Sequence, residues 1–178
     1  MKRPTTVVTI ALLALFISAP TMAAKQEAGA NAAPLLLAAR DGEPLIHAAF
    51  GKARLDSCFD LASLTKPLAT TAAAMLLEAE GVLSSKSRLV ELLPSLRGKP
   101  VAESTLGALL SHSSGLPAWR PYDERAAELD HASAKRAIRR WVADEELAYA
   151  PGSRCLYSDL GFILLDWALE RTAGKPLH

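Results

Sequence analysis

The order of the secondary-structure signals most constrains the fold of this chain. Two short apolar segments, residues 35–37 and 45–50, flank residues 40–43, whose Asp-Gly dipeptide favours a tight turn between antiparallel strands. Only helix-forming segments follow, without a strand between them. This order argues against a doubly wound parallel sheet and predicts an α+β fold, in which an antiparallel sheet is flanked by a helical cluster.

The helical part begins with one long helix. The composition of residues 64–80 predicts it, with Pro67 in the first turn and Gly81 as the terminator. Three further helices are expected: one capped by Ser104 and ending near His112, one capped by Ser133 and running to about Val142, and one over residues 160–172, capped by Ser158 or Asp159 with Gly174 behind it.

Composition excludes several classes of protein. The 178 residues contain 20 basic and 19 acidic side chains and are 50% hydrophobic, enough for about one domain with a core. Because neither sign of charge dominates, nucleic acid is not an expected partner. No Cys-x-x-Cys or His-Glu-x-x-His pattern occurs, so neither a metal nor another cofactor is predicted.

The N-terminus resembles an export signal. Lys2 and Arg3 precede an uncharged stretch over residues 7–19, and small residues follow Pro20. We expect a signal peptide over residues 1–23, a flexible leader over 24–33, and a periplasmic or secreted protein. A membrane-spanning helix needs about 20 apolar residues, and this stretch is shorter, so no stable membrane anchor is expected.

Ser63 and Lys66 are the first candidates for chemistry. Three residues apart at a helix start, they project from one face within a turn. The spacing alone is weak evidence, because 14 serines and 8 lysines produce about 0.6 such pairs by chance. A buried amine at a helix N-terminus is expected to be neutral and therefore able to accept the serine proton.

Three sequence segments give the pair a context. Phe-Asp-Leu-Ala-Ser-Leu-Thr-Lys spans residues 59–66, Leu-Leu-Ser-His-Ser-Ser-Gly-Leu-Pro spans 109–117, and residues 151–165 contain Pro-Gly-Ser followed by Tyr-Ser-Asp-Leu-Gly. Together they resemble the serine β-lactamase-related hydrolases, which include class C β-lactamases, D-alanyl-D-alanine carboxypeptidases and esterases. The resemblance covers residues 34–178 and implies a β-lactamase/transpeptidase-like fold.

The resemblance also implies roles for individual residues. Ser63 would be the nucleophile, Lys66 its base partner and Tyr157 the acid/base that carries a proton to the leaving group. Asp159 stands where the lactamases and transpeptidases have asparagine, and would contact substrate. Because a carboxylate only accepts hydrogen bonds, this favours a general serine hydrolase over a penicillin-binding enzyme. Asp159 as a helix N-cap is an alternative that is compatible with this role.

Other residues of these segments have less specific interpretations. His112 lies in a segment that resembles a structural turn of the family, so a catalytic role is not expected. Trp119 and Tyr122 either line a substrate cleft or pack in the protein. If the resemblance brings Ser63 and Tyr157 together, Cys58 and Cys155 come near each other and a disulfide is an open alternative.

A third motif of the family is missing. No Lys-Thr-Gly, Lys-Ser-Gly or His-x-Gly follows Tyr157, so we expect an N-terminal part of the domain, truncated before the C-terminal sheet strands. The predicted function is an exported serine hydrolase that forms an acyl-enzyme on Ser63. Its partner would be a small-molecule or peptide acyl substrate: an ester, an amide, a β-lactam or a peptidoglycan-derived D-Ala peptide. The alternative is an inactive remnant or a peptidoglycan-peptide binding module.

Overall fold

The computed structural model describes residues 34–177. The chain forms two units, one ending at Ala62 and one beginning at Ser63. The predicted signal peptide (1–23) and leader (24–33) lie outside the described residues. In the part that is described, no helix is both long and apolar enough to cross a membrane.

The first unit contains the predicted hairpin. Strands β1 (Leu35–Arg40) and β2 (Glu43–Ala49) pair antiparallel. Asp41 and Gly42 connect them with φ angles of 53° and 86°. A two-residue type I′ turn requires positive φ at both positions, and Asp-Gly tolerates this well. The Asp-Gly signal therefore correctly located the hairpin.

The register of the two strands contains one irregularity. Leu35 pairs with Ala49, and the register shifts between Ala38 and Ala39, before the turn. Leu45 and Ile46 of β2 are exposed. A two-stranded sheet buries little apolar surface, as expected for so small a sheet.

The second unit begins with the predicted long helix. A 3-10 turn, η2 (Ala62–Leu64), leads to a π-helix, η3 (Lys66–Thr71), which continues as α1 (Ala72–Ala79). Pro67 lies in the first turn of η3, where its missing N–H leaves no donor unsatisfied. Gly81 follows the helix with a φ of 71°. The prediction over residues 64–80 is thus confirmed, although its first turns are not α-helical.

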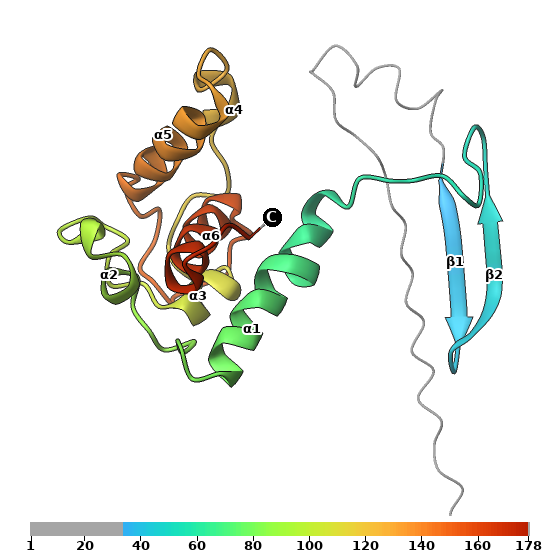
Figure 1. Ribbon diagram of the computed structural model, residues 1–178, viewed down its shortest axis with the longest axis horizontal. Helices are drawn as coiled ribbons and strands as arrows, with labels where there is room; N and C mark the ends of the chain where they lie inside the picture. The colour runs from blue at the N-terminus through green and yellow to red at the C-terminus, as the bar shows by residue number, and fades with distance from the viewer. Residues whose placement is uncertain (1–33, 178) are drawn as a thin grey trace, which may run out of the picture. The chain divides into compact units, whose positions relative to one another are not determined.

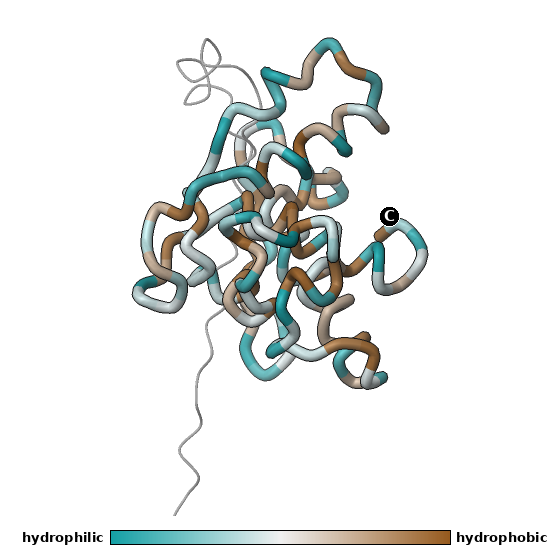
Figure 2. The backbone as a smooth tube through the Cα atoms, turned by 90° about the vertical axis from the view of Figure 1, so that its left-hand side faces the viewer, coloured by the Kyte–Doolittle hydropathy of each residue, from teal (hydrophilic) through white to brown (hydrophobic). Residues whose placement is uncertain are grey.

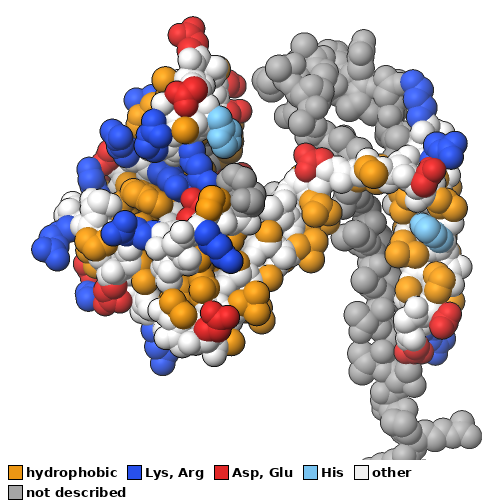
Figure 3. All heavy atoms as spheres, in the orientation of Figure 1, with side chains coloured by type: hydrophobic (Ala, Val, Ile, Leu, Met, Phe, Trp, Pro, Cys, Tyr) orange, Lys and Arg blue, Asp and Glu red, His pale blue; other side chains and the backbone are white. Residues whose placement is uncertain are grey.

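One face of this segment is apolar and exposed. Figure 3 shows hydrophobic side chains along the helix, and Leu68, Met75 and Leu76 are each more than three-fifths exposed.

Helix α6 (Asp159–Ala173) is the centre of the second unit. It contacts α1, α2 (Leu89–Leu92), α3 (Leu106–Leu110) and α5 (His131–Ala143), as Figure 1 shows. Four of its leucines are completely or almost completely buried: Leu160, Leu164, Leu165 and Leu169. Figure 2 shows hydrophobic stretches alternating with hydrophilic ones along the backbone. Each buried leucine stabilises the fold by about 1.5–3 kcal/mol.

Three short helical segments were not predicted. They are α2, the 3-10 helix η4 (Pro94–Leu96) and α4 (Tyr122–Arg125). Segments of three or four residues are too short to show helical periodicity, so the sequence offers no signal for them.

Two predicted helix caps are wrong. Thr105, not Ser104, caps α3, because its hydroxyl accepts from the Ala108 N–H at 3.1 Å. Asp130, not Ser133, caps α5, and its carboxylate accepts from the Ser133 N–H itself. In both cases a neighbouring residue of the cap-forming class occupies the position from which a side chain reaches the free amides.

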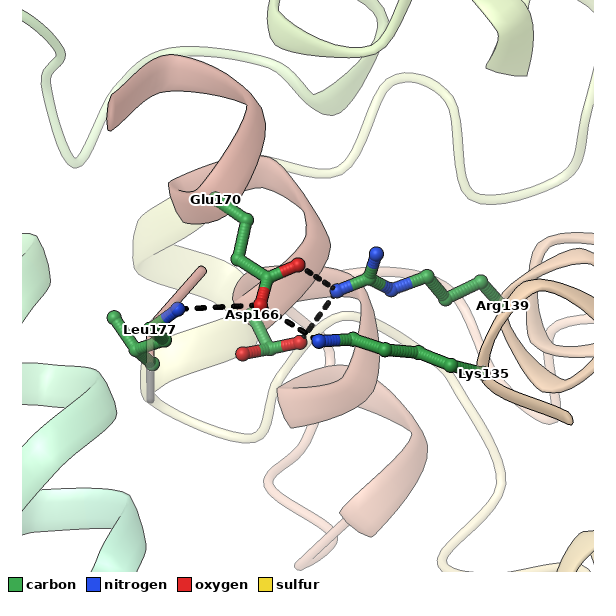
Figure 4. Close-up of polar contacts among 5 residues, drawn as sticks. All are labelled: Lys135, Arg139, Asp166, Glu170 and Leu177. Atoms are coloured by element: carbon green, nitrogen blue, oxygen red, sulfur yellow. Dashed lines mark hydrogen bonds and ion pairs between the residues drawn. The ribbon is translucent and has the colours of Figure 1, made fainter. Parts of the chain in front are cut away.

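Ion pairs join α5 to α6. Lys135 lies 2.7 Å from Glu170, and Arg139 lies 2.7 Å from Asp166 and 2.5 Å from Glu170. Figure 4 shows the four side chains converging, with the Leu177 N–H donating to Glu170 at 3.2 Å. We call these four side chains the α5–α6 network. Although burial alone would raise it, Lys135 and Arg139 lower the pKa of Glu170 to about 2.

Candidate active site

Ser63 and Lys66 lie within hydrogen-bonding distance, as their spacing predicted. Ser63 is in the 3-10 turn η2, and Lys66 is the first residue of η3. The Lys66 Nζ donates to Ser63 Oγ at 3.2 Å. Ala62, directly before Ser63, has a φ of 45°, which is unfavourable for a residue with a side chain. The candidate nucleophile therefore follows a backbone position of high conformational energy.

The loop before α6 supplies the second half of the site. Ser158 caps α6 by accepting from the Gly161 N–H at 3.2 Å, and its hydroxyl donates to the Pro117 carbonyl at 2.7 Å. The Asp159 N–H donates to the Ala118 carbonyl at 2.9 Å. These bonds hold Tyr157 and Asp159 in place against the 117–118 segment. The cap is Ser158, one of the two predicted candidates, which leaves the Asp159 carboxylate free for another contact.

That contact is an ion pair with Lys66. The Lys66 Nζ lies 2.7 Å from Asp159 Oδ1 and 5.2 Å from the centre of the Tyr157 ring. Phe162, on the first turns of α6, contributes a second aromatic face at 5.7 Å. The four residues predicted from sequence, Ser63, Lys66, Tyr157 and Asp159, thus meet around one ammonium group. Phe162 was not singled out from the sequence, although it lies in a segment used to identify the family.

The expectation that Lys66 is neutral is wrong. Burial does lower its pKa, but hydrogen bonding and charge interactions with Asp159 and Tyr157 outweigh burial, and the pKa is raised above its usual value. The helix start and desolvation favour the neutral amine, but the Asp159 carboxylate, far away along the chain, lies 2.7 Å from Lys66 in space. Lys66 is therefore an ammonium at neutral pH and donates to Ser63.

His112 lies beside the cluster without contacting the nucleophile through a hydrogen bond. Its Nδ1 accepts from the Ser158 N–H at 3.0 Å, and its ring centre lies 4.5 Å from that of Tyr157. Among residues 34–177, no hydrogen bond joins His112 to Ser63. The segment around it turns sharply at Gly115, where a Cβ would lie 2.5 Å from the Tyr149 carbonyl oxygen.

Of the two aromatic residues that follow this turn, one packs within the unit. The Tyr122 hydroxyl donates to the Trp141 carbonyl at 3.3 Å and also to Glu145, and the Tyr122 and Trp141 rings lie 5.5 Å apart. Burial, followed by the contact with Glu145, raises the pKa of Tyr122 to about 12. Tyr122 therefore links α4 to α5, while Trp119 is exposed.

Cys58 and Cys155 are both exposed free thiols. They belong to different units, and the predicted disulfide stays a prediction.

A cavity of about 490 Å³ lies away from these residues. Side chains of α5 line it together with residues around η4, among them Leu96, and with Trp167 of α6, and none of the four predicted site residues contributes to it. Within residues 34–177, no group of three or more His, Cys, Asp or Glu side chains is arranged to hold a metal ion. The chemistry available at the cluster is that of a hydroxyl beside an ammonium, a phenol and a carboxylate.

Comparison with known proteins agrees with this chemistry. A family profile described as Beta-lactamase matches residues 19–178. The D-alanyl-D-alanine-carboxypeptidase/endopeptidase AmpH of Escherichia coli K12 is 29% identical over 162 residues, covering 83% of this chain and 41% of that protein. Esterase EstB of Burkholderia gladioli is 33% identical over 163 residues, covering 79% of this chain and 41% of that protein.

A solved structure agrees in fold. The penicillin-binding protein homologue from Pyrococcus abyssi superposes with a TM-score of 0.60 at 29% identity, covering 77% of this chain and 34% of that chain. The chain spans 31–41% of the length of these and other curated relatives. The two-stranded sheet and the helical cluster correspond to part of a β-lactamase/penicillin-binding-protein fold.

Proposed function

The chain belongs to the β-lactamase family of serine hydrolases, and from this premise we propose that it hydrolyses an acyl substrate through an acyl-enzyme on Ser63. The observation that carries the proposal is the position of the Lys66 ammonium, 3.2 Å from Ser63 Oγ and 2.7 Å from Asp159. A nucleophilic serine needs a neighbouring group that orients it and a group that accepts its proton.

The charges assign different tasks to the neighbours of Ser63. Because Lys66 is held as an ammonium by Asp159, it orients Ser63 and stabilises negative charge that develops beside it. Tyr157 is then the proton relay. As Ser63 Oγ bonds to the substrate carbonyl carbon, the phenol oxygen accepts the serine proton while its own proton passes to the leaving group, whose bond to the carbonyl carbon breaks. Water then attacks the ester carbonyl, releases the acid and restores the Ser63 hydroxyl.

The substrate class follows from the relatives and from Asp159. The relatives are named as a carboxypeptidase/endopeptidase and an esterase, which supports ester, amide and D-Ala peptide substrates, including peptides of peptidoglycan. Asp159 offers the substrate only acceptor oxygens. It therefore favours substrates with a donor group near the scissile bond, such as a peptide N–H, over β-lactams.

We further propose that the protein acts outside the cytoplasm. Lys2, Arg3 and the apolar stretch after them support export with cleavage after Ala23. N-terminal sequencing of the protein recovered from the periplasm or medium should begin at Ala24. A recovered chain that still begins at Met1 would contradict this part of the proposal.

Intact-mass measurement with serine-reactive reagents tests the proposed nucleophile. The full chain is treated with a fluorophosphonate, which phosphonylates serine and releases fluoride, and separately with benzylpenicillin, which adds as a whole molecule. One phosphonyl adduct is expected, lost in Ser63→Ala and kept in the control Ser153→Ala, which changes an exposed serine outside the cluster. Slow or absent penicillin addition is expected from Asp159. No adduct, or an adduct that survives Ser63→Ala, would sink the proposal and favour a binding module without turnover.

A further inference from the structure

His112 is anchored to the loop that carries Tyr157 by its backbone. It follows the last turn of α3 and has a φ of 56°, in the left-handed region. Its carbonyl oxygen accepts from the Leu156 N–H at 2.9 Å and from the Tyr149 hydroxyl at 3.0 Å. The turn containing His112 and the segment before α6 are therefore held together on the N-terminal side of Tyr157.

The His112 side chain contacts the same loop on the other side of Tyr157. Its Nδ1 accepts from the Ser158 N–H at 3.0 Å. Its ring lies against Tyr157, with centres 4.5 Å apart, and against Phe162, at 5.2 Å. Three consecutive residues, 156 to 158, thus contact His112 through its carbonyl, its ring face and its Nδ1.

From these contacts we infer that His112 is a positioning residue that holds Tyr157 in the place where it exchanges a proton with Ser63. The inference rests on the proposed function, because it assigns the placement of the proposed acid/base to a residue outside the Ser63–Lys66–Tyr157 set. Tyr157 is half exposed, so solvent leaves its ring free to move unless a neighbour restrains it. A displacement of about 1 Å at such a group can cost about a hundredfold in rate.

The contact with Ser158 requires an unprotonated Nδ1. Burial and the nearby Lys66 charge lower the pKa of His112, and together they outweigh the opposing contributions of the Ser158 N–H and Asp159. The other titratable groups facing it are the phenols of Tyr157 and Tyr149. Protonation would put a ring N–H against the Ser158 N–H and a second positive charge near Lys66. The loop should therefore loosen on the acid side of neutrality.

Two variants of His112 distinguish the contribution of its hydrogen-bond acceptor from that of its aromatic ring. His112→Asn keeps an acceptor oxygen at the δ position and does not titrate, whereas His112→Phe keeps an aromatic face and has no acceptor. Turnover of p-nitrophenyl acetate by the full chain should fall about tenfold or more in kcat for His112→Phe, with KM unchanged. His112→Asn should stay within about fivefold of the wild type and lose the acid limb that His112 contributes.

Tyr149→Phe is the matched control. It removes one of the two donors to the His112 carbonyl and leaves the Leu156 N–H and the imidazole contacts in place, so kcat and its pH profile should be unchanged. If both His112 variants and Tyr149→Phe lose the same activity, in proportion to a loss of folded protein, His112 is merely structural and the inference is overturned.

A second measurement decides the matter even if the chain does not turn over substrate. In the ¹⁵N spectrum of the labelled protein, His112 should titrate below its usual pKa, with Nδ1 as the acceptor nitrogen, and the Ser158 amide should shift over the same pH range. Failure of acylation at Ser63 with this coupled titration intact would refute the proposed function alone. A Ser158 amide shift that does not follow the His112 titration, or a His112 pKa at its usual value, would refute the positioning role whatever the activity.

Discussion

Helix α6 carries an ion-pair site near each end, and the two sites are built differently. At its first residue, Asp159 pairs with the single cation Lys66. Further along, Asp166 and Glu170 pair with two cations of α5, Lys135 and Arg139. The first site is a single ion pair whose ammonium also contacts a hydroxyl and a phenol, and the second consists of two cations paired with two carboxylates.

Solvent exposure separates the two sites further. In the α5–α6 network the four side chains are 13–28% exposed, whereas at the first site Lys66 is 17% and Asp159 42% exposed. The network holds its charges in fixed pairs and lowers the pKa of Glu170 to about 2. The Lys66–Asp159 pair leaves ammonium hydrogens for Ser63. The half-buried network joins α5 to α6, while the pair with the more exposed carboxylate and a donor to spare is available for chemistry.

The largest expected effect is on rate, at the first site. Replacing Lys66 by Met removes the ammonium that orients Ser63, and the rate of Ser63 acylation should fall by about 10²–10³. Stability should change little, since water can solvate the half-exposed Asp159 that is left behind. Stopped-flow acylation and urea unfolding measure the two quantities. In the matched variant Lys135→Met, stability should fall and the acylation rate should stay near that of the wild type. An equal loss of stability in both variants would contradict the difference between the two sites.

The next largest effect is on stability, at the second site. Glu170→Gln should lower the free energy of unfolding by about 3 kcal/mol at pH 7, because Lys135 and Arg139 lose a buried partner. The folded-state pKa of Glu170 is depressed, so its contribution is present above the unfolded value of 4.5 and is lost as pH falls to about 2. The free energy of unfolding of the wild type, measured with urea, should decrease as the pH falls through this range. An equally steep decline in Glu170→Gln would assign the loss to other groups.

A smaller effect is expected from neutralising Asp159. Without this carboxylate the pKa of Lys66 is no longer raised by its partner, so the alkaline limb of the acylation rate should move to lower pH in Asp159→Asn. At neutral pH the rate should change by less than about fivefold, as for a partly exposed pair. A pH–rate profile checks this. If the rate instead rises as the pH passes through the Lys66 pKa, Lys66 acts in its neutral form and this prediction is wrong.

The smallest effect is expected where a pair is exposed on both sides. Lys99 and Asp144 form such a pair, at 41% and 55% exposure. Asp144→Asn should change the free energy of unfolding by less than about 0.5 kcal/mol. A loss comparable to that of Glu170→Gln would show that burial is not what distinguishes the α5–α6 network.

Much of this arrangement could be read from local sequence. The Asp-Gly turn, the long helix ended by Gly81 and the left-handed Gly174 after α6 are confirmed, because each depends on the backbone preferences of a few adjacent residues. The helix caps show the limit of such signals. Near α3 and α5 two candidates of the same class stand close together, and only the course of the backbone selects Thr105 and Asp130.

The sequence by itself determined which residues to look for at the site, and four of them meet in the structure. Ser63 and Lys66 meet because they are three positions apart on one helical segment, and the three motif segments name Tyr157 and Asp159 as their companions. Tertiary structure decided the protonation state. Lys66 is charged, contrary to the local argument, because folding brings α6 and its first carboxylate to within 2.7 Å. Electrostatic energies depend on distance through space, which spacing along the chain does not report, and the contact of His112 with Ser158 arises in the same way.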